Sequence, residues 1–279
     1  MTAVEGVSGG GSLYTCCNEH AKQNNGRMLG ADESIGRGRS QAILQMPDGT
    51  SIEAEKISEG QVIKAAGISI VKEDSHIRYE EIISRDSIPR YHTVIVPRCG
   101  EYNLILPDGT EVWLNSQTVL NFPLNFSASD DRRVALSGEA FFKVAHDPKR
   151  PFVVETDMGE VRAYGTSLNV EAYDDQTYIR ATLIYGSMGY RAPGRTGGEV
   201  LLSPGQQVCY AGRGMPEITE VKTENGIDWK SGYFNFESER LEDIMMRLSR
   251  WYFINVVFED DELRNILFTG KIGLLLTSD

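Results

Sequence analysis

One turn signature occurs twice in this chain and limits its fold more than any other feature. The tetrapeptide Pro-Asp-Gly-Thr stands at residues 47–50 and again at residues 107–110. Proline presets φ at the first central turn position, aspartate bonds its own backbone, and glycine accepts the left-handed conformation that reverses the chain. Each copy lies between segments that alternate apolar and polar residues. Both copies therefore predict β-hairpins in a β-rich protein.

The alternation around the second turn can be followed residue by residue. After the turn, Val112 and Leu114 fall on one face of the expected strand and Trp113 falls on the other. Before the turn, Leu104 and Leu106 share one face in the same way. This period of two predicts antiparallel strands that are buried on one side only.

Length and charge restrict the class of protein. A chain of 279 residues, 41% of them apolar, can bury one large core or two modest ones, and we expect two domains. The net charge of -12 argues against nucleic-acid binding, which needs a clustered basic surface. No run approaches the roughly 20 apolar residues that span a bilayer, and residues 1–30 lack the apolar centre of a signal peptide. We therefore expect a soluble piece.

The pattern divides the chain into four segments. Residues 1–40 are rich in Gly, Asn and Ser and predict a flexible leader outside the fold, and residues 41–90 predict a small β-meander and linker. Residues 91–225 carry many short strands with Gly and Pro turns. This favours a solenoid-like or sandwiched antiparallel β-domain over a closed barrel. Residues 226–279 predict a small, truncated α+β module.

The last segment shows a change from strand to helix periodicity. Ser238 is the expected N-cap of a helix whose apolar residues recur between residues 241 and 251. Strands are expected on both sides of this helix, ending at Phe236 and resuming at residues 254–258. A further strand is expected at residues 266–272, after which the module is expected to be cut short.

Glycines punctuate the expected strands of the main segment. Glycine is the residue for which positive φ or close backbone approach costs least. At one of these points a turn is expected to separate strands at residues 133–136 and 140–144. The glycines interpreted as strand-end punctuation are Gly100, Gly138, Gly165, Gly186 and Gly205.

The order of motifs resembles a known family. The motifs are Pro-Arg-Cys-Gly-Glu-Tyr at 97–102, Leu-Pro-Asp-Gly-Thr-Glu-Val-Trp-Leu-Asn at 106–115, Leu-Ser-Gly-Glu-Ala-Phe-Phe-Lys-Val at 136–144, Pro-Phe-Val-Val at 151–154, Gly-Thr-Ser-Leu-Asn-Val at 165–170, Gly-Ser at 186–187 and Pro-Gly-Gln-Gln at 204–207. Together they resemble the periplasmic part of FecR-type anti-sigma factors. Members of this family are inner-membrane regulators that couple outer-membrane TonB-dependent transporters to extracytoplasmic-function sigma factors. The resemblance runs from about residue 41 to residue 272.

The tail from residue 232 to residue 252 is similar to the Bacteroidetes branch, whose C-terminal module resembles the secretin and TonB short N-terminal domain. The chain departs from the family pattern at Cys99, where Gly is usual, and at Tyr185 and Met188. Relatives also carry a cytoplasmic sigma-binding domain and a transmembrane helix ahead of this region. The resemblance therefore implies a periplasmic portion that reaches the sigma factor and the membrane only through segments this sequence lacks.

The leading functional hypothesis is signal transmission by protein-protein contact. The resemblance implies that the signalling domain of a TonB-dependent transporter is the partner. Two surfaces are candidates, an exposed strand edge of the C-terminal module and the charged face of its helix, because strand addition and aromatic or arginine hot spots are common binding modes. The candidate partner-binding residues are Arg240, Asp243, Arg247, Arg250, Trp251 and Tyr252.

A carbohydrate-binding β-module is the alternative function. Aromatic side chains stack on sugars, although aromatics that alternate along strands more often pack on a sheet. The aromatic residues considered for this role are Trp113, Tyr173, Tyr178 and Tyr185.

An enzyme is a third hypothesis, which we reject. A glycosidase needs two carboxylates that face each other across a substrate. Glu139, Asp174 and Asp175 are the carboxylates considered, but their spacing places no pair on one face. Asp174 and Asp175 are typical of a turn between strands.

Metal and cofactor binding find no support in the residue spacing. The cysteines and histidines do not recur at ligand distances. We expect no cofactor and interpret His76, His92 and His146 as lone surface histidines, with Cys99 and Cys209 as small buried thiols. The remaining candidate ligands, Cys16, Cys17 and His20, lie in the leader.

Overall fold

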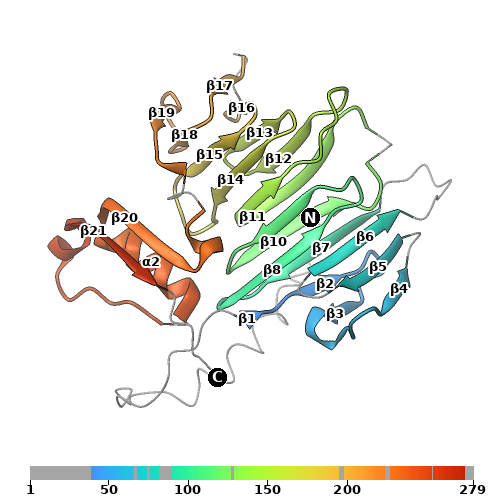
Figure 1. Ribbon diagram of the computed structural model, residues 1–279. Coiled ribbons are helices and arrows are strands. Elements are labelled where there is room, and N and C mark those ends of the chain that lie inside the picture. Colours follow the sequence, from blue (N-terminus) through green and yellow to red (C-terminus); the bar gives the residue numbers. More distant parts are fainter. Residues whose placement is uncertain are drawn as a thin grey trace, which may run out of the picture. The chain divides into compact units, whose positions relative to one another are not determined.

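In the computed structural model, β-strands are the main elements of the described chain (Figure 1). The leader predicted at residues 1–40 lies outside the described residues except at its end. There Arg39 and Ser40 form a short strand that pairs with the main sheet, so the prediction that they lie outside the fold was wrong. The described residues are 39–65, 68–73, 76–81, 90–126, 129–194, 198–223, 227–252 and 254–273.

The described strands up to residue 220 form one continuous sheet of 19 strands. Its strands are β1 (Arg39–Ser40), β2 (Ile43–Gln45), β3 (Ser51–Glu53), β4 (Val62–Ala65), β5 (Ile68–Glu73), β6 (His76–Glu81), β7 (Tyr91–Val96), β8 (Gly100–Ile105), β9 (Glu111–Leu114), β10 (Thr118–Pro123), β11 (Arg132–Lys143), β12 (Phe152–Thr156), β13 (Gly159–Ala163), β14 (Ser167–Ala172), β15 (Ile179–Tyr185), β16 (Met188–Arg191), β17 (Val200–Leu202), β18 (Gln206–Tyr210) and β19 (Glu217–Glu220). A short 3-10 turn, η1 (Ala54–Lys56), follows β3.

This sheet folds over on itself at β11 into two layers. One layer has the order β3-β2-β7-β10-β11-β12-β13-β16-β17. The other has the order β4-β5-β6-β8-β9-β11-β14-β15-β18-β19. Neighbours are mostly antiparallel, with β11–β12 and β6–β8 parallel. The prediction of a mainly β, sandwiched domain is confirmed.

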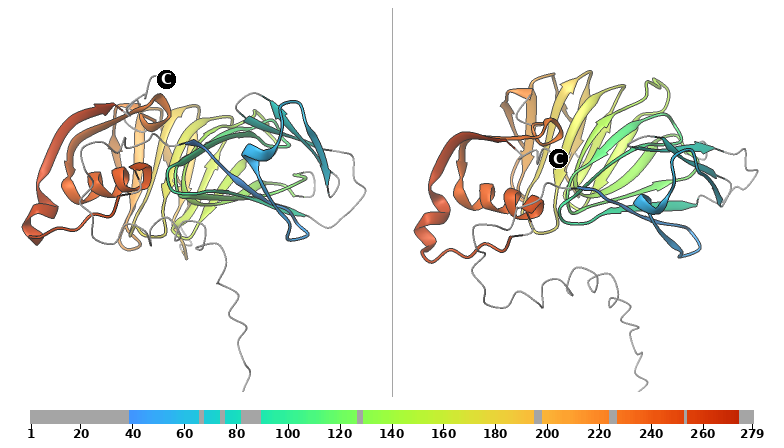
Figure 2. Two further views of the ribbon diagram at one scale, coloured as in Figure 1. Left: turned by 90° about the horizontal axis from the view of Figure 1, so that it is seen from below. Right: turned by 60° about the horizontal axis from the view of Figure 1, so that its bottom comes forward.

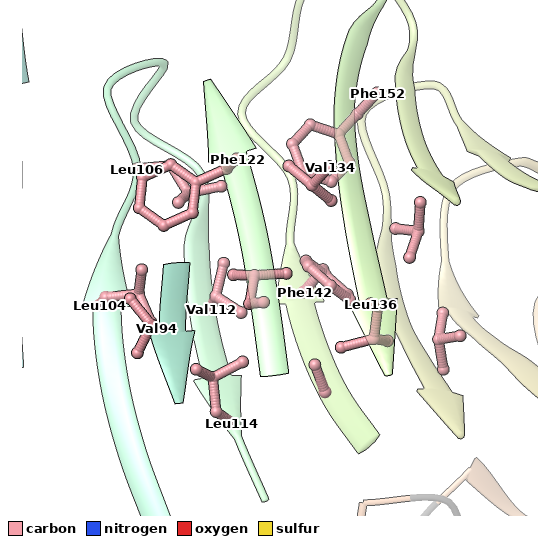
Figure 3. Close-up of a cluster of buried hydrophobic side chains, with 14 of the residues drawn as sticks. Val94, Leu104, Leu106, Val112, Leu114, Phe122, Val134, Leu136, Phe142 and Phe152 are labelled. Carbon is pink, nitrogen blue, oxygen red and sulfur yellow. The ribbon is translucent and has the colours of Figure 1, made fainter. Parts of the chain in front are cut away.

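The space between the layers is filled by apolar side chains from both (Figure 3). Val94 and Phe122 come from one layer, and Leu104 and Phe142 come from the other, all at most 1% exposed. The Phe142 ring lies 5.7 Å from the Phe152 ring. Burial of each such side chain contributes about 1.5–3 kcal/mol, so the sandwich interior is the principal source of stability.

Both Pro-Asp-Gly-Thr turns form the predicted hairpins, between β2 and β3 and between β8 and β9. In each turn the aspartate accepts a bond from the N–H of the threonine two residues later, at 2.9 Å in the first and 3.0 Å in the second. The glycines have φ of 86° and 83°. Asp108 also binds the buried Arg132 guanidinium at 2.7 Å, which joins the second turn to β11.

The strands of residues 41–81 extend the main sheet. β4, β5 and β6 pair consecutively as a meander, and β6 then pairs with β8. β2 pairs with β7. The sequence suggested a small β-segment of its own here, whereas the pairing makes these strands the outer part of both layers. Most of the linker expected before residue 90 lies outside the described residues.

The two strands expected at residues 133–136 and 140–144 are one strand, β11, and the turn expected between them was wrong. Gly138 is the residue at which β11 leaves β10 and begins to pair with β14. Its φ is 116°, and a Cβ atom there would lie 2.5 Å from Thr118 Oγ1 and 2.6 Å from Thr118 Cα. Glycine is needed because the backbones pass so closely at the change of layer.

The C-terminal module contains a strand hairpin and a helix, which lies alongside β20 (Figure 2). The expected helix is confirmed, but Ser238 does not cap it. Ser238 has φ of 50° in a bulge of the first strand, and its N–H donates to Thr269 Oγ1 at 2.9 Å. Residues 254–258 are not a strand. The elements are η3 (Trp229–Ser231), β20 (Tyr233–Arg240), α2 (Leu241–Tyr252), η4 (Asp261–Asn265) and β21 (Leu267–Gly273).

One histidine predicted to lie on the surface is in the sandwich core. His92 is fully buried, with Tyr79 Oη 3.2 Å from its Nδ1 and Met46 Sδ 2.6 Å from its Nε2. Burial lowers the pKa of His92 to about 4, so it is neutral at pH 7. His146 is exposed and His76 is half-buried beside a glutamate. Within the described part of the chain, no group of side chains could hold a metal ion.

Candidate functional site

The outer face of the sheet carries a second apolar cluster, separate from the sandwich core. Phe141 of β11 points away from that core and packs with residues of the C-terminal module. Trp113 lies beside it at a ring distance of 5.4 Å, and the Lys230 ammonium lies 3.6 Å from the centre of the Trp113 ring. This cluster attaches the module to the sheet. Its buried members are Phe141, Trp229, Phe234, Phe236, Ile244 and Trp251.

The last turn of α2 is bound by main-chain and side-chain donors of the sheet domain. The final carbonyls of a helix have no partner within the helix. Here the Arg250 carbonyl accepts from the Cys99 N–H at 2.8 Å and from Ser116 Oγ at 2.7 Å, and Arg98 Nη2 donates to the Ser249 carbonyl at 2.7 Å. The Arg98 cation also complements the negative end of the helix dipole.

Cys99 stands where the resembling family usually has glycine, and its backbone explains that preference. Its φ is 62°, in the left-handed region that favours glycine. This conformation directs the Cys99 N–H to the helix end. Cys99 and Cys209 are half-buried, less enclosed than expected, and neither is joined in a disulfide within the described chain.

The Arg250 side chain is buried between the module and the sheet. Its guanidinium lies 3.7 Å from the centre of the Tyr173 ring and 2.5 Å from Asp175 Oδ1, and Arg250 is only 3% exposed. The sequence placed Arg250 on a charged helix face that was expected to be open to a partner. Arg250 is not on an open face, because it lies in the contact between α2 and the β14–β15 turn.

Arg247 links three elements inside the module. It donates to the buried Asp228 carboxylate at 3.2 Å and to Glu239 Oε2 at 3.0 Å. Burial raises the pKa of Asp228 and of Glu239, and Arg247 opposes that rise by stabilising the charged forms. Arg247 is therefore a structural cation that holds α2 against η3 and β20.

Glu139 lies on the outer face of β11 and is half-buried beside the module. It accepts from Asn115 Nδ2 at 2.7 Å and from Asn169 Nδ2 at 2.9 Å. Glu171 stands directly opposite on β14 and faces Arg180 at 3.5 Å. Burial first, and then the charge of Glu171, raise the pKa of Glu139 to about 7. Two opposed carboxylates on one face of a sheet are unfavourable unless one is protonated or compensated.

The carboxylates considered for catalysis each bind a different partner. Asp174 accepts from Ser137 Oγ at 2.7 Å, whereas Asp175 binds Arg250 and Glu139 binds the two asparagines. These contacts hold the three carboxylates apart from one another.

The six candidate partner-binding residues fall into two groups. Arg240 is exposed and pairs with Glu242 at 2.6 Å, and Asp243 is half-buried. Arg247, Arg250 and Trp251 are held inside the module or against the sheet, while Tyr252 is half-buried. The contacts of the sheet residues Arg98, Ser116 and Tyr173 with the C-terminal end of α2 were not predicted from the sequence. The position of Arg98 and Ser116 in or beside the family motifs was the only signal that could have found them.

The four aromatics considered for sugar binding do not form one platform. Lys230 covers Trp113, Arg250 covers Tyr173, and the Arg180 guanidinium lies 4.4 Å from the centre of the Tyr178 ring. Only Tyr185, 71% exposed, presents its ring to solvent. A single exposed tyrosine makes a poor sugar platform.

The module presents one long exposed strand. All seven residues of β21 are exposed, and apolar side chains are prominent among them: Leu267 is 60% exposed, Phe268 46% and Ile272 41%. β21 pairs with β20 and with no other strand in the described ranges. A strand with one unpaired edge and apolar side chains is a ready acceptor for another strand.

Comparisons with known proteins agree with this architecture. Residues 93–187 match the family described as "FecR protein", and residues 233–274 match "FecR, C-terminal". A crystal structure of a proposed anti-sigma factor from Parabacteroides distasonis ATCC 8503 at 1.65 Å has a TM-score of 0.61 and 26% identity, covering 66% of this chain and 86% of that chain. A second structure with the same description, at 2.50 Å, has a TM-score of 0.58 and 27% identity, covering 67% and 86%. No curated protein matches the sequence.

The FecR match thus lies within the sandwich, and the match to the C-terminal FecR domain covers β20, α2 and β21 of the module. These two domain matches, together with the likeness to the anti-sigma factor structures, support a FecR-type anti-sigma factor region with a regulatory signalling role. No helix in the described residues is long and apolar enough to cross a membrane.

Proposed function

We propose that this chain is the periplasmic sensing region of an anti-sigma factor and relays the state of a TonB-dependent outer-membrane transporter to an extracytoplasmic-function sigma factor. The relay works through protein-protein contact. The match to both FecR domains supports this proposal. The alternative of a carbohydrate-binding module loses support because three of its four aromatics are covered.

The observation that carries the proposal is the exposed strand β21. In strand addition, backbone hydrogen bonds to an unpaired edge supply affinity, and alternate side chains supply specificity. β21 offers such an edge together with Leu267, Phe268 and Ile272. We therefore place the signalling domain of the transporter on β21, with one of its strands extending the β20–β21 sheet.

The contacts of the module provide a route from this edge to the sandwich. β21 pairs with β20, and the Ile266 carbonyl accepts from the first N–H of α2, that of Leu241, at 2.8 Å. The other end of α2 is bound by Cys99 and Ser116 of the sheet domain. A partner that shifts β21 therefore acts on a helix whose far end is fixed to the sandwich.

A titration of the chain with the signalling domains of neighbouring transporters tests this proposal. We expect one domain to bind with Kd below about 10 μM, and Leu267→Asp to weaken binding at least about tenfold because it places a charge in the apolar contact. Val257→Asp is the matched control, since Val257 is 85% exposed but lies outside β21. Absence of binding by every domain, or equal effects of the two variants, contradicts the proposal.

A further inference from the structure

A polar cavity of about 680 Å³ lies between the outer face of the sheet and the module. Its floor comes from β11, β14, β15 and β18, and its opposite wall from β20 and α2. Cavities of this size commonly hold small molecules. This one differs from an apolar ligand pocket in its charged walls.

The walls contain more carboxylates than cations. Glutamates and aspartates contribute six lining residues, and arginines and lysines contribute four. Each of the four cations already has a carboxylate partner: Arg180 pairs with Glu171, Lys222 with Glu237, Arg240 with Glu242 and Arg247 with Glu239.

Glu139 forms no ion pair within the described residues. It is held only by the two asparagine amides, and it lies half-buried in the wall of the cavity. A partly buried carboxylate without an ion pair is costly. The lining carries two more carboxylates than cations, and Glu139 is a carboxylate of this lining that no cation of the described residues pairs with.

Two buried oxygen atoms in the walls also lack a hydrogen-bond partner. They are Asn169 Oδ1 and Glu239 Oε1, and Asn169 is 5% exposed. The Asn169 amide turns its Nδ2 to Glu139, so its oxygen is left as a free acceptor. Both unfilled atoms accept hydrogen bonds, so a group that fills them must donate.

We propose that this cavity is a binding site for a small organic cation, in which an ammonium or guanidinium group donates to Glu139, Asn169 and Glu239. An ammonium has three donors and a guanidinium has five, and either supplies a positive charge. Glu139 and Asn169 belong to the sheet and Glu239 to the module. The bound cation joins the two and stabilises their docked arrangement. This site does not depend on the proposed transporter contact.

Calorimetric titration of the full chain at pH 8 with agmatine and with putrescine tests the site. We expect saturable binding with Kd below about 1 mM and no binding of 1,4-butanediol, which has the same carbon chain as putrescine without the charge. Binding is expected to weaken at pH 6, since the pKa of Glu139 is about 7 and its protonated form carries no charge.

Glu139→Gln is the decisive variant, because it keeps the size and one acceptor of the side chain but removes the charge. We expect it to weaken amine binding at least about tenfold, while Glu217→Gln on the exposed strand β19 leaves binding unchanged. A thermal melt confirms that both variants are folded. Absence of saturation by both amines, equal binding by the two variants, or binding of calcium chloride in place of the amines overturns the proposal. No transporter domain is present, so failure here is distinct from failure of the relay.

Discussion

The two sides of strand β11 differ in chemistry although they share one backbone. On the inner side, Phe142 packs among apolar side chains of both layers. On the outer side, Phe141 and Glu139 lie beneath the C-terminal module, among aromatics, arginines and carboxylates. The inner side is built for stability alone, whereas the outer side holds a second body through contacts that a ligand or partner can change.

Truncating the two adjacent phenylalanines is the strongest way to break this comparison. Phe142→Ala is expected to lower the free energy of global unfolding by about 3–5 kcal/mol, because it leaves a cavity between the layers. Phe141→Ala is expected to loosen the module while the sandwich remains folded. Denaturant unfolding combined with hydrogen exchange of α2 separates the two effects. Equal loss of sandwich stability in both variants would contradict the distinction.

Removing the cation inside the module tests the outer side alone. Arg247→Met leaves the buried Asp228 and Glu239 without their partner, which costs about 3–5 kcal/mol for a buried pair. The loss is expected in the local stability of residues 227–252, measured by hydrogen exchange. Arg264→Met is the control, because the ion pairs of Arg264 are exposed to solvent and its loss should change nothing measurable.

Gly138 is the point where the two layers meet, and its substitution affects both. Gly138→Ala is expected to cost about 2–4 kcal/mol, since it adds strain at positive φ and a clash with Thr118. Gly205 also has a positive φ, 86°, but has open space around it, so Gly205→Ala tests the backbone strain without the clash. Thermal denaturation of both variants measures the difference. If the two melt alike, the close approach of the backbones is not what requires glycine.

The pH dependence of stability tests whether the outer side of β11 contains a carboxyl group, that of Glu139, with a raised pKa. The pKa of Glu139 is raised from 4.5 to about 7, so between these pH values the folded chain holds a proton that the unfolded chain has released. The contribution of Glu139 to the free energy of unfolding is therefore at its maximum below pH 4.5, and it decreases as the pH rises toward 7. Glu139→Gln should remove this fall. Urea unfolding from pH 4.5 to pH 8 compares the two chains, and parallel curves would show that Glu139 titrates normally.

The smallest effect on stability is expected at Tyr185, which is largely exposed to solvent. Its ring is 71% exposed, so Tyr185→Ala should change the free energy of unfolding by less than about 0.5 kcal/mol. A denaturant titration measures this change. A larger loss of stability would show that the Tyr185 ring makes a stabilising contact in the folded chain, which would contradict its placement in solvent.

The inner side of the sheet could be predicted from the sequence, and the outer side could not. The period of two placed Val112 and Leu114 inside, and the two Pro-Asp-Gly-Thr turns gave the hairpins, because both signals are local. Glu139 is covered by a module that is distant in the sequence. Arg250 of that module is buried against Tyr173 and Asp175, the latter 75 residues earlier in the chain, so no local pattern contains either contact. Gly138 was interpreted as part of a turn because the sequence alone does not distinguish a glycine inside a strand from a glycine between two strands.

The helix of the C-terminal module was predicted correctly, but the connections at its two ends were not. The helix over residues 241–252 follows from the spacing of its apolar residues. Ser238 is a residue type that commonly caps helices, but in the structure it lies in a bulge of β20. Its N–H is bound by Thr269 of the paired strand, a contact that a local pattern cannot show. The alternation that suggested a strand at residues 254–258 lacks a neighbouring strand in the described structure to pair with it.

Hydrogen exchange of the full chain, alone and with a cognate transporter signalling domain, tests the central claim that the module is docked by α2 and open at β21. The account predicts slow exchange in residues 241–252 of the free chain, and new protection in residues 267–273 when the domain binds. Fast exchange throughout α2 in the free chain, or protection that spares β21, would contradict it.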